Sequence, residues 1–249
     1  HVNGSQVILQ LAHAGRKSKV EEEPILAPSA IVFSDEYKSP MAMTQEQIDE
    51  VVEAFQQGAR RALEAGFDGI EIHAAHGYLI NQFLSPLTNQ RTDSYGGDLE
   101  DRTKFLRQVL AAVGEVWDKN KPISLRVSAE EYQVEGNHPN DLVEIINGVK
   151  EGGIDLIHVS SGGVVSATIP LYPGYQLTFA ETIKKNTGLP VIAGGLITKS
   201  KMAEEIIRNG RADFVFVGRE LLRNPYWPLH ASQKLGIDIP WPEQYERSK

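Results

Sequence analysis

The stretch Ile123-Ser-Leu-Arg-Val-Ser128 alternates apolar and polar residues, which is the pattern of a β-strand. Five more short apolar runs, rich in β-branched residues, lie at residues 7–11, 69–73, 156–160, 190–193 and 214–217. Longer amphipathic stretches separate them. Because strands and helices alternate strictly, the chain is predicted to form a parallel sheet with right-handed crossovers.

The clearest helix start lies between the first two strands. Thr44 with Gln47 three residues later resembles a capping box, in which each side chain bonds to the other residue's backbone. Apolar residues then recur at helical spacing as far as Ala62, and Gly66 suits the position just after the last turn.

Two later helices have similar signals. Thr178 with Glu181 repeats the opening pattern, and Gly188 is predicted to end that helix. Another helix is predicted over residues 202–209, before Gly210.

Six strands are two short of a closed (β/α)₈ TIM barrel. No linker or low-complexity tract interrupts the chain, so residues 1–249 are interpreted as one barrel domain, incomplete at the N-terminus, with strands 3–8 present. The chain also begins with His1 and enters a strand almost at once. An open doubly wound sheet has the same alternation and is the structural alternative.

The composition is that of an ordinary globular protein, with 41% apolar and 23% charged residues. A net charge of −8 argues against a nucleic-acid or anionic-membrane surface, because both need clustered Lys and Arg. The absence of cysteine excludes disulfides, thiolate metal sites and iron–sulfur clusters from this chain. Because no signal peptide or membrane-spanning apolar stretch is found, we predict a cytoplasmic protein.

Glycines follow the last two predicted strands, in Ala193-Gly-Gly195 and Val217-Gly-Arg219. Barrel enzymes often bind phosphate at this position, where glycine lets backbone N–H groups approach an anion and arginine adds charge. Two tight turns with a surface arginine are the alternative. The phosphate site is favoured, and its candidate residues are Gly194, Gly195, Gly218 and Arg219.

Arg126 shares a strand face with Ser124 and Ser128 and is predicted to point into the barrel. A buried cation needs a partner, which is either the carboxylate of Glu71 or an anionic ring edge such as that of a reduced flavin. Gln10 interrupts the first strand and, if it is buried, needs hydrogen-bond partners. It bonds either to a uracil-like ring edge or to the backbone.

His73, His76 and Tyr78 leave the end of one strand together. The histidines have three interpretations: a metal site, for which no third ligand is evident; packing; or hydrogen bonds to a substrate carbonyl or nitro oxygen. The last is favoured, with Tyr78 as a proton donor. No hydrolase elbow, Walker loop or dinucleotide fingerprint is present, so a flavin would have to be held by the barrel itself.

Together these residues resemble the Old Yellow Enzyme family, most closely its bacterial NADPH dehydrogenase class. The likeness runs essentially from end to end. It is carried by Gln10-Leu-Ala-His-Ala-Gly-Arg16, by Gly69-Ile-Glu-Ile-His-Ala-Ala-His-Gly-Tyr-Leu79, and by residues 28–31, 81–97, 159–162 and 217–225.

The resemblance implies a role for each candidate residue. Gln10 and Arg126 match the residues at the pyrimidine edge of the flavin, and Gly218 and Arg219 match the phosphate binders, with Gly194 and Gly195 beside them. His73 and His76 match the pair that holds the substrate oxygen, although some branches have asparagine at the second position. Tyr78 matches the proton donor, and Arg247 matches an arginine that reaches a neighbouring subunit's active site.

The implied activity is an FMN-dependent NADPH dehydrogenase, or ene-reductase, in a homo-oligomer. NADPH gives hydride to flavin N5, which passes it to the C=C bond of an α,β-unsaturated carbonyl or nitro compound. Family members begin with two further βα units that contact the flavin. Without them, we expect this chain alone to be poorly soluble or to bind FMN weakly, at a cost in activity.

Three other functions are weighed against this one. The chain is alternatively the flavin barrel of a larger enzyme, such as a dienoyl-CoA reductase or an amine dehydrogenase, although those relatives carry an iron–sulfur motif and this chain has no cysteine. A phosphate-binding barrel isomerase or lyase explains Gly218 and Arg219 but not Gln10, Arg126 and the histidines together. An inactive interaction module is the third alternative.

Overall fold

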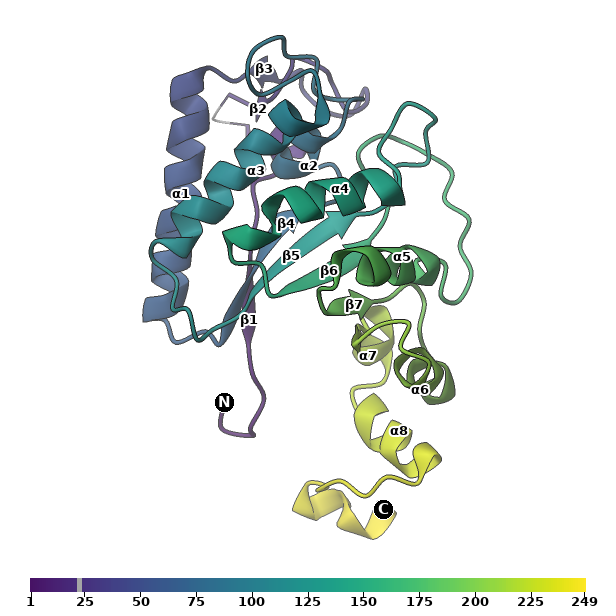
Figure 1. The fold of residues 1–249 in the computed structure, drawn as a ribbon. Coiled ribbons are helices and arrows are strands. Elements are labelled where there is room, and N and C mark those ends of the chain that lie inside the picture. The colour runs from purple at the N-terminus through teal and green to yellow at the C-terminus, as the bar shows by residue number, and fades with distance from the viewer. Residues whose placement is uncertain (22–23) are drawn as a thin grey trace.

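The computed structural model describes residues 1–21 and 24–249. Its centre is a six-stranded parallel sheet in which the strands lie side by side in the order of the sequence (Figure 1). The strands are β1 (Ile8–Leu11), β4 (Gly69–Ala74), β5 (Ile123–Ser128), β6 (Leu156–Ser160), β7 (Val191–Ala193) and β8 (Phe214–Val215). All six predicted strands are confirmed, with boundaries that shift by two residues at most.

Helices connect the strands and cover one face of the sheet, where α1, α3, α4 and α5 lie next to one another (Figure 1). The helices are α1 (Gln45–Glu64), α2 (Leu79–Leu84), α3 (Leu99–Gly114), α4 (Pro139–Val149), α5 (Leu177–Thr187), α6 (Ser200–Arg208), α7 (Arg219–Arg223) and α8 (Trp227–Leu235). Short 3₁₀ helices are η1 (Gly15–Lys17), η2 (Lys150–Gly152) and η3 (Glu243–Ser248). Among the described helices, none combines the length and the apolarity needed to cross a membrane.

The order of the strands in the sheet is that of a barrel. A doubly wound sheet reverses its strand order and carries helices on both faces. Here the order β1-β4-β5-β6-β7-β8 never reverses. The barrel prediction is therefore confirmed over its open alternative.

Each strand presents an apolar face to the helices and a polar face to the inside of the curve. The fully buried residues Ile70, Ile72, Leu125, Val127, Ile157 and Val159 make the helix-covered face. The residues between them point the opposite way, because side chains alternate along a strand. Strand register places Gln10 opposite Glu71, Glu71 opposite Ser124, and His73 opposite Arg126 on that inner face.

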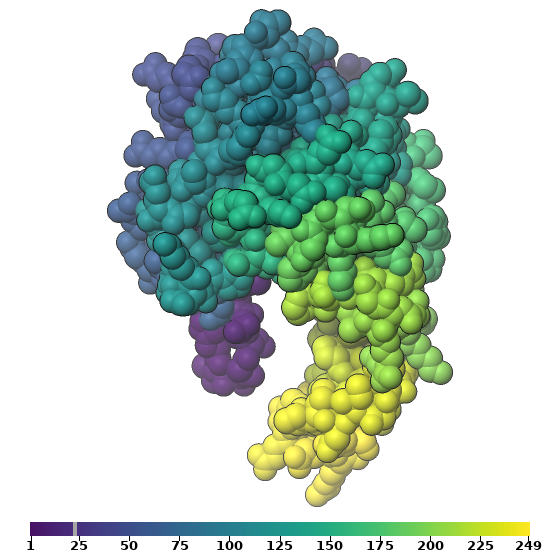
Figure 2. Space-filling view, in the orientation of Figure 1, coloured from purple at the N-terminus to yellow at the C-terminus, as the bar shows by residue number. Residues whose placement is uncertain are grey.

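The two outer strands, β1 and β8, each have one neighbour in the sheet. Apolar residues on the inner face of these two strands are exposed to solvent: Ile8 is 48% exposed and Phe214 55%. The space-filling view shows a gap between the N-terminal segment and the C-terminal helices (Figure 2).

A second parallel pair, β2 (Leu26–Ala27) and β3 (Met41–Ala42), lies outside the main sheet. The sequence did not indicate it, because two-residue strands carry no periodicity that a pattern can detect.

Most predicted helix ends are confirmed, although α6 begins at Ser200, two residues before the predicted start, and ends at Arg208, one residue early. Thr44 and Gln47 form the capping box of α1, and Gly66 adopts a left-handed φ of 83° directly after it. The prediction that Thr178 caps α5 was wrong. The cap position is Gln176, two residues earlier, because Leu177 is buried in the core and its N–H bonds to the Gly174 carbonyl, so Thr178 lies within the first turn.

These two threonines form a matched test of capping. Replacing Thr44 with alanine removes the side-chain oxygen that accepts the Gln47 N–H, so we expect the free energy of unfolding to fall by about 1 kcal/mol. Replacing Thr178, which is exposed and caps nothing, should change it by less than about 0.5 kcal/mol. Urea unfolding measures both, and equal losses would contradict the assignment of the cap.

Candidate active site

Arg126 lies on the inner face of β5, half buried, as the sequence predicted. Its Nε atom is buried and has no hydrogen-bond partner within residues 1–21 and 24–249. The guanidinium lies 5.6 Å from the centre of the Phe216 ring, which gives it a cation–π contact. Burial lowers the pKa of Arg126, and the charge of Glu71 opposes that effect.

Glu71, the alternative partner of Arg126, is occupied by three other side chains. Its Oε1 accepts from Gln10 Nε2 at 2.6 Å, and its Oε2 accepts from Ser124 Oγ at 2.9 Å and from His158 Nδ1 at 2.8 Å. Burial alone would raise the pKa of Glu71, but the hydrogen bonds and charge of His158, with those of Gln10 and Ser124, lower it to about 2. Glu71 is therefore ionised, and within the described chain no hydrogen bond joins it to Arg126.

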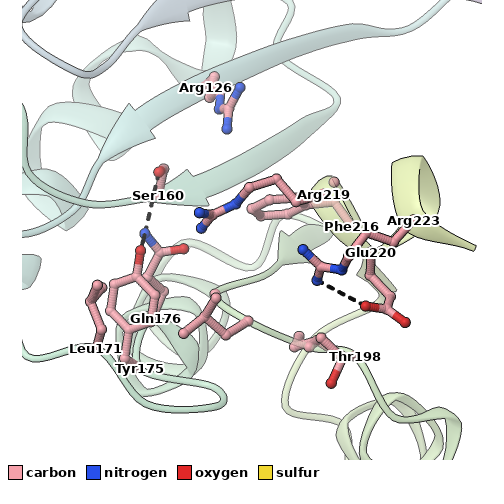
Figure 3. Close-up of a pocket in the computed structure, with 14 residues that line it drawn as sticks. Arg126, Ser160, Leu171, Tyr175, Gln176, Thr198, Phe216, Arg219, Glu220 and Arg223 are labelled. Carbon is pink, nitrogen blue, oxygen red and sulfur yellow. Dashed lines mark hydrogen bonds and ion pairs between the residues drawn. The ribbon is translucent and has the colours of Figure 1, made fainter.

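A cavity of about 310 Å³ opens beside Arg126 at the carboxyl ends of β6, β7 and β8. Arg126 and Arg219 come from different walls and point into the same space (Figure 3). Other lining residues include Ser160, Tyr175, Gln176, Gly195, Phe216 and Gly218. The predicted cofactor residues Arg126, Gly195, Gly218 and Arg219 are thus brought together, while Gln10 lies two strands away from Arg126 on the same face.

The three glycines at this cavity differ in what they do. A Cβ at Gly218 would meet nothing within 4 Å, so the backbone there is open to a ligand. Gly195 has a left-handed φ of 94°, and a Cβ would lie 3.0 Å from the Tyr175 ring. At Gly194 a Cβ would overlap the Phe216 ring, so this glycine makes room for an aromatic side chain.

His73 and His76 form a short chain of polar contacts. His73 Nδ1 accepts the Ala75 N–H at 3.1 Å, so the proton of a neutral His73 is on Nε2. That atom lies 3.4 Å from His76 Nδ1, and His76 Nε2 lies 2.6 Å from Ser160 Oγ, at the edge of the cavity. The Tyr78 ring packs against His73, with 4.9 Å between the ring centres.

Burial keeps both histidines neutral. Desolvation, followed by the charge of Arg126, lowers the pKa of His73 to about 4. The same two causes, with His73 and Lys17, lower the pKa of His76 to about 3. At neutral pH each ring therefore has one N–H donor and one acceptor. Within residues 1–21 and 24–249 no group of three metal-ligating side chains comes together.

The backbone at His76 is held in an unusual conformation. His76 has a φ of 58°, a region that costs energy for residues other than glycine. Its N–H bonds to Ser128 Oγ at 2.9 Å, and its carbonyl accepts from Lys17 Nζ at 2.9 Å. The next residue, Gly77, is held by Asn81 and Gln82 at 2.7 and 2.6 Å. Side chains from four positions therefore fix the loop that carries His76.

Sequence reasoning missed two adjacent cations, of which Lys17 supports this loop and Arg16 supports neighbouring segments. Arg16 is 2% exposed and donates to the carbonyls of Ile31, Val32 and Val164. Lys17 bonds to the Gly163 carbonyl at 3.0 Å and lies over the Phe33 ring. The signal in the sequence was two adjacent cations a few residues after β1, where the carboxyl end of a barrel strand opens toward the site.

Arg247 is not brought to the site of its own chain. It belongs to η3, which has no buried residue and lies beyond α8, away from the sheet (Figure 1). Its predicted contact with a neighbouring subunit stays a prediction.

Comparison with known proteins gives the family. Residues 1–237 match the model of the NADH:flavin oxidoreductase / NADH oxidase family. The chain belongs to this family. It is 56% identical over 245 residues to the NADPH dehydrogenase of Geobacillus thermodenitrificans, covering 98% of this chain and 71% of that protein. It is 54% identical over 248 residues to that of Halalkalibacterium halodurans, covering 100% of this chain and 72% of that protein.

Solved structures of flavin oxidoreductases share the fold. Morphinone reductase superposes with a TM-score of 0.78 at 28% identity, over 98% of this chain and 69% of its own. A complex of 2-naphthoyl-CoA reductase with 2-naphthoyl-CoA superposes with a TM-score of 0.88 at 28% identity, over 95% of this chain. The chain spans only 39% of that larger protein. These matches confirm the TIM-barrel class and the resemblance to the Old Yellow Enzyme family.

Family membership makes the chain an oxidoreductase, with FMN and NADPH as the cofactors that the family and its NADPH dehydrogenases imply. The residues present fit FMN. Arg126 has a buried nitrogen atom that meets no hydrogen-bond partner in the part of the chain that the structure describes, and the backbone at Gly218 is open beside the Arg219 guanidinium. A ring edge with acceptor atoms and a phosphate group would satisfy both.

The neutral histidines predict how stability depends on pH. In the unfolded chain both histidines take up a proton below the ordinary histidine pKa of about 6.5. In the folded chain the pKa of His73 is about 4 and that of His76 about 3, so between these values the unfolded chain binds more protons than the folded one. Stability should therefore fall as the pH drops from 7 to 5. In a variant with both histidines changed to asparagine, the fall should be smaller. Urea unfolding at pH 7 and pH 5 checks this. Equal losses of unfolding free energy in the wild type and the double variant would contradict it.

Proposed function

We propose that the chain is an FMN-dependent NADPH dehydrogenase that reduces the C=C bond of α,β-unsaturated carbonyl or nitro compounds. The observation that carries the proposal is the Arg126 guanidinium on the inner face: Glu71 acts on it through its charge, but no hydrogen bond within residues 1–21 and 24–249 joins the two, because Glu71 is bonded to other groups. Partly burying a cation whose N–H groups lack acceptors is costly, so the site favours a ligand with electron-rich acceptor atoms.

Two ends of the cavity suit two parts of one ligand. Arg126 would hold the pyrimidine edge of FMN, together with Gln10 on the same face. Arg219 and the open backbone at Gly218 would hold the phosphate, with Gly195 beside them and Gly194 behind the Phe216 ring. When bound, FMN supplies the redox chemistry, accepting hydride from NADPH and delivering it from N5 to the alkene.

The histidines would bind the electron-withdrawing oxygen of the substrate. As neutral rings they donate N–H groups without adding charge to a buried site. His73 is the more available donor, because its Nε2 has only a 3.4 Å contact with His76, whereas His76 Nε2 is bound to Ser160 at 2.6 Å. Such donors stabilise negative charge that develops on the oxygen during reduction.

Tyr78 would supply the proton at the α-carbon. Its ring packs against His73, which places it next to the proposed oxygen site. Arg247 would act in a neighbouring copy of a homo-oligomer, because η3 holds it away from the cavity of its own chain. The names of the relatives, which are NADPH dehydrogenases and a morphinone reductase, support a small-molecule substrate.

Binding of FMN tests the role of Arg126. We expect the wild-type chain to bind FMN, even if weakly, and to quench its fluorescence on titration, and we expect Arg126→Gln to raise the dissociation constant by about 10- to 100-fold through loss of a charged hydrogen bond. Arg211→Gln is the control, because Arg211 pairs with Glu181 and Glu205 outside the cavity and should not matter. Equal affinities for the wild type and Arg126→Gln would contradict the assignment.

Turnover of an alkene tests the histidines. The double variant His73→Ala/His76→Ala should oxidise NADPH with a cyclic enone about 100-fold more slowly or worse, because it lacks the donors to the developing oxyanion. FMN binding should persist, since neither ring lines the cavity. Near-normal enone reduction in this variant would refute the mechanism.

A further inference from the structure

We propose that Glu71 is a positioning residue, which fixes the Gln10 carboxamide so that its carbonyl oxygen is presented to the pyrimidine edge of the cofactor. The inference rests on the proposed function and deepens it. It assigns a task to a charged side chain, 8% exposed, that the mechanism does not otherwise use.

Strand register brings the participants together. Gln10, Glu71 and Ser124 are direct neighbours across β1, β4 and β5, on the inner face of the sheet. Ser124 Oγ and His158 Nδ1 both bond to Oε2 of Glu71, so this oxygen is fully engaged. The other oxygen, Oε1, is left for Gln10, whose Nε2 donates to it at 2.6 Å.

The ionised carboxylate decides which way the Gln10 amide faces. A carboxylate without a proton can only accept hydrogen bonds, so it selects the NH₂ end of the amide. The carbonyl oxygen of Gln10 is then the end left for a ligand. An amide with a neutral neighbour would be free to present either end.

This fixed polarity complements a uracil-like ring. Such a ring edge carries an N–H between two carbonyl oxygens. Gln10 offers an acceptor for the N–H, and Arg126 offers donors for a carbonyl oxygen. Glu71 therefore has two effects: it orients the acceptor, and because its oxygens are bonded to Gln10, Ser124 and His158 it acts on Arg126 through charge alone, so that within the described residues the buried Arg126 Nε keeps its hydrogen free for a ligand.

The same carboxylate also supports one wall of the cavity. It holds His158, whose ring lies 4.5 Å from the ring of Phe216 between centres. Phe216 lines the cavity and lies under Arg126. Loss of the charge at Glu71 should therefore mainly change the orientation of the Gln10 amide, and to a smaller extent the position of His158 and Phe216 in this wall.

A double-mutant cycle on FMN affinity tests the inference. Glu71→Gln keeps the size of the side chain and removes the charge, and we expect it to raise the FMN dissociation constant about tenfold. Gln10→Ala should have a similar effect. If Glu71 acts through Gln10, the double variant should bind no more weakly than Gln10→Ala by itself. Losses that multiply in the double variant, or a Glu71→Gln protein that binds like the wild type, would overturn the proposal.

The matched control is Asp155→Asn. Asp155 accepts the Ile123 N–H at 2.8 Å, at the opposite end of β5 from the cavity, so loss of its charge should leave FMN affinity unchanged. If Glu71→Gln does not fold, Glu71→Asp serves instead, because it keeps the charge but withdraws the carboxylate from Gln10 by one methylene group.

A measurement without FMN separates this inference from the proposed function. In the ¹⁵N-labelled apoprotein, the side-chain amide signals of Gln10, assigned by their loss in Gln10→Ala, should exchange with solvent more slowly in the wild type than in Glu71→Gln, because Gln10 Nε2 donates to the carboxylate. Unchanged exchange would overturn the positioning role even if FMN binds. If exchange differs between the wild type and Glu71→Gln as expected, but the wild type never binds FMN, the result would instead contradict the proposed function.

Discussion

The organisation of this chain depends on the alternation of side chains along its parallel strands. Ile72, Leu125 and Val159 are completely buried beneath the helices, and they fix which face of each strand is covered. Every second residue is thereby forced onto the inner face, where Glu71, Arg126 and the histidines meet. A slip of one residue in register would exchange the two faces and bury these charges among apolar side chains. The core therefore determines the site.

Much of the fold was predictable from local patterns. The strands and the capping box of α1 were indicated because strand alternation and helix capping are properties of neighbouring residues. Thr178 was misjudged because the start of α5 is set by the burial of Leu177 and by a turn at Gly174, which are tertiary effects. The short β2–β3 pair was missed for the same reason, since each strand exists only through the other.

The candidate site was predictable in outline only. Alternation placed Arg126 inside, but whether Glu71 neutralised it depended on contacts across β1, β4, β5 and β6. The support of His76 by Lys17 and Ser128 was equally hidden, because these residues lie 59 and 52 positions away along the chain. Gly194 was expected beside the phosphate, and the structure shows it making room for Phe216.

The close packing of Gly194 and Phe216 couples two positions at the ends of adjacent strands. A methyl group at 194 has no space while an aromatic ring occupies 216, and a smaller side chain at 216 would leave a void against the glycine. Substitutions at these positions should therefore succeed as compensating pairs and fail singly. Anyone who reshapes this pocket, whether by selection or by design, would have to change both residues in one step.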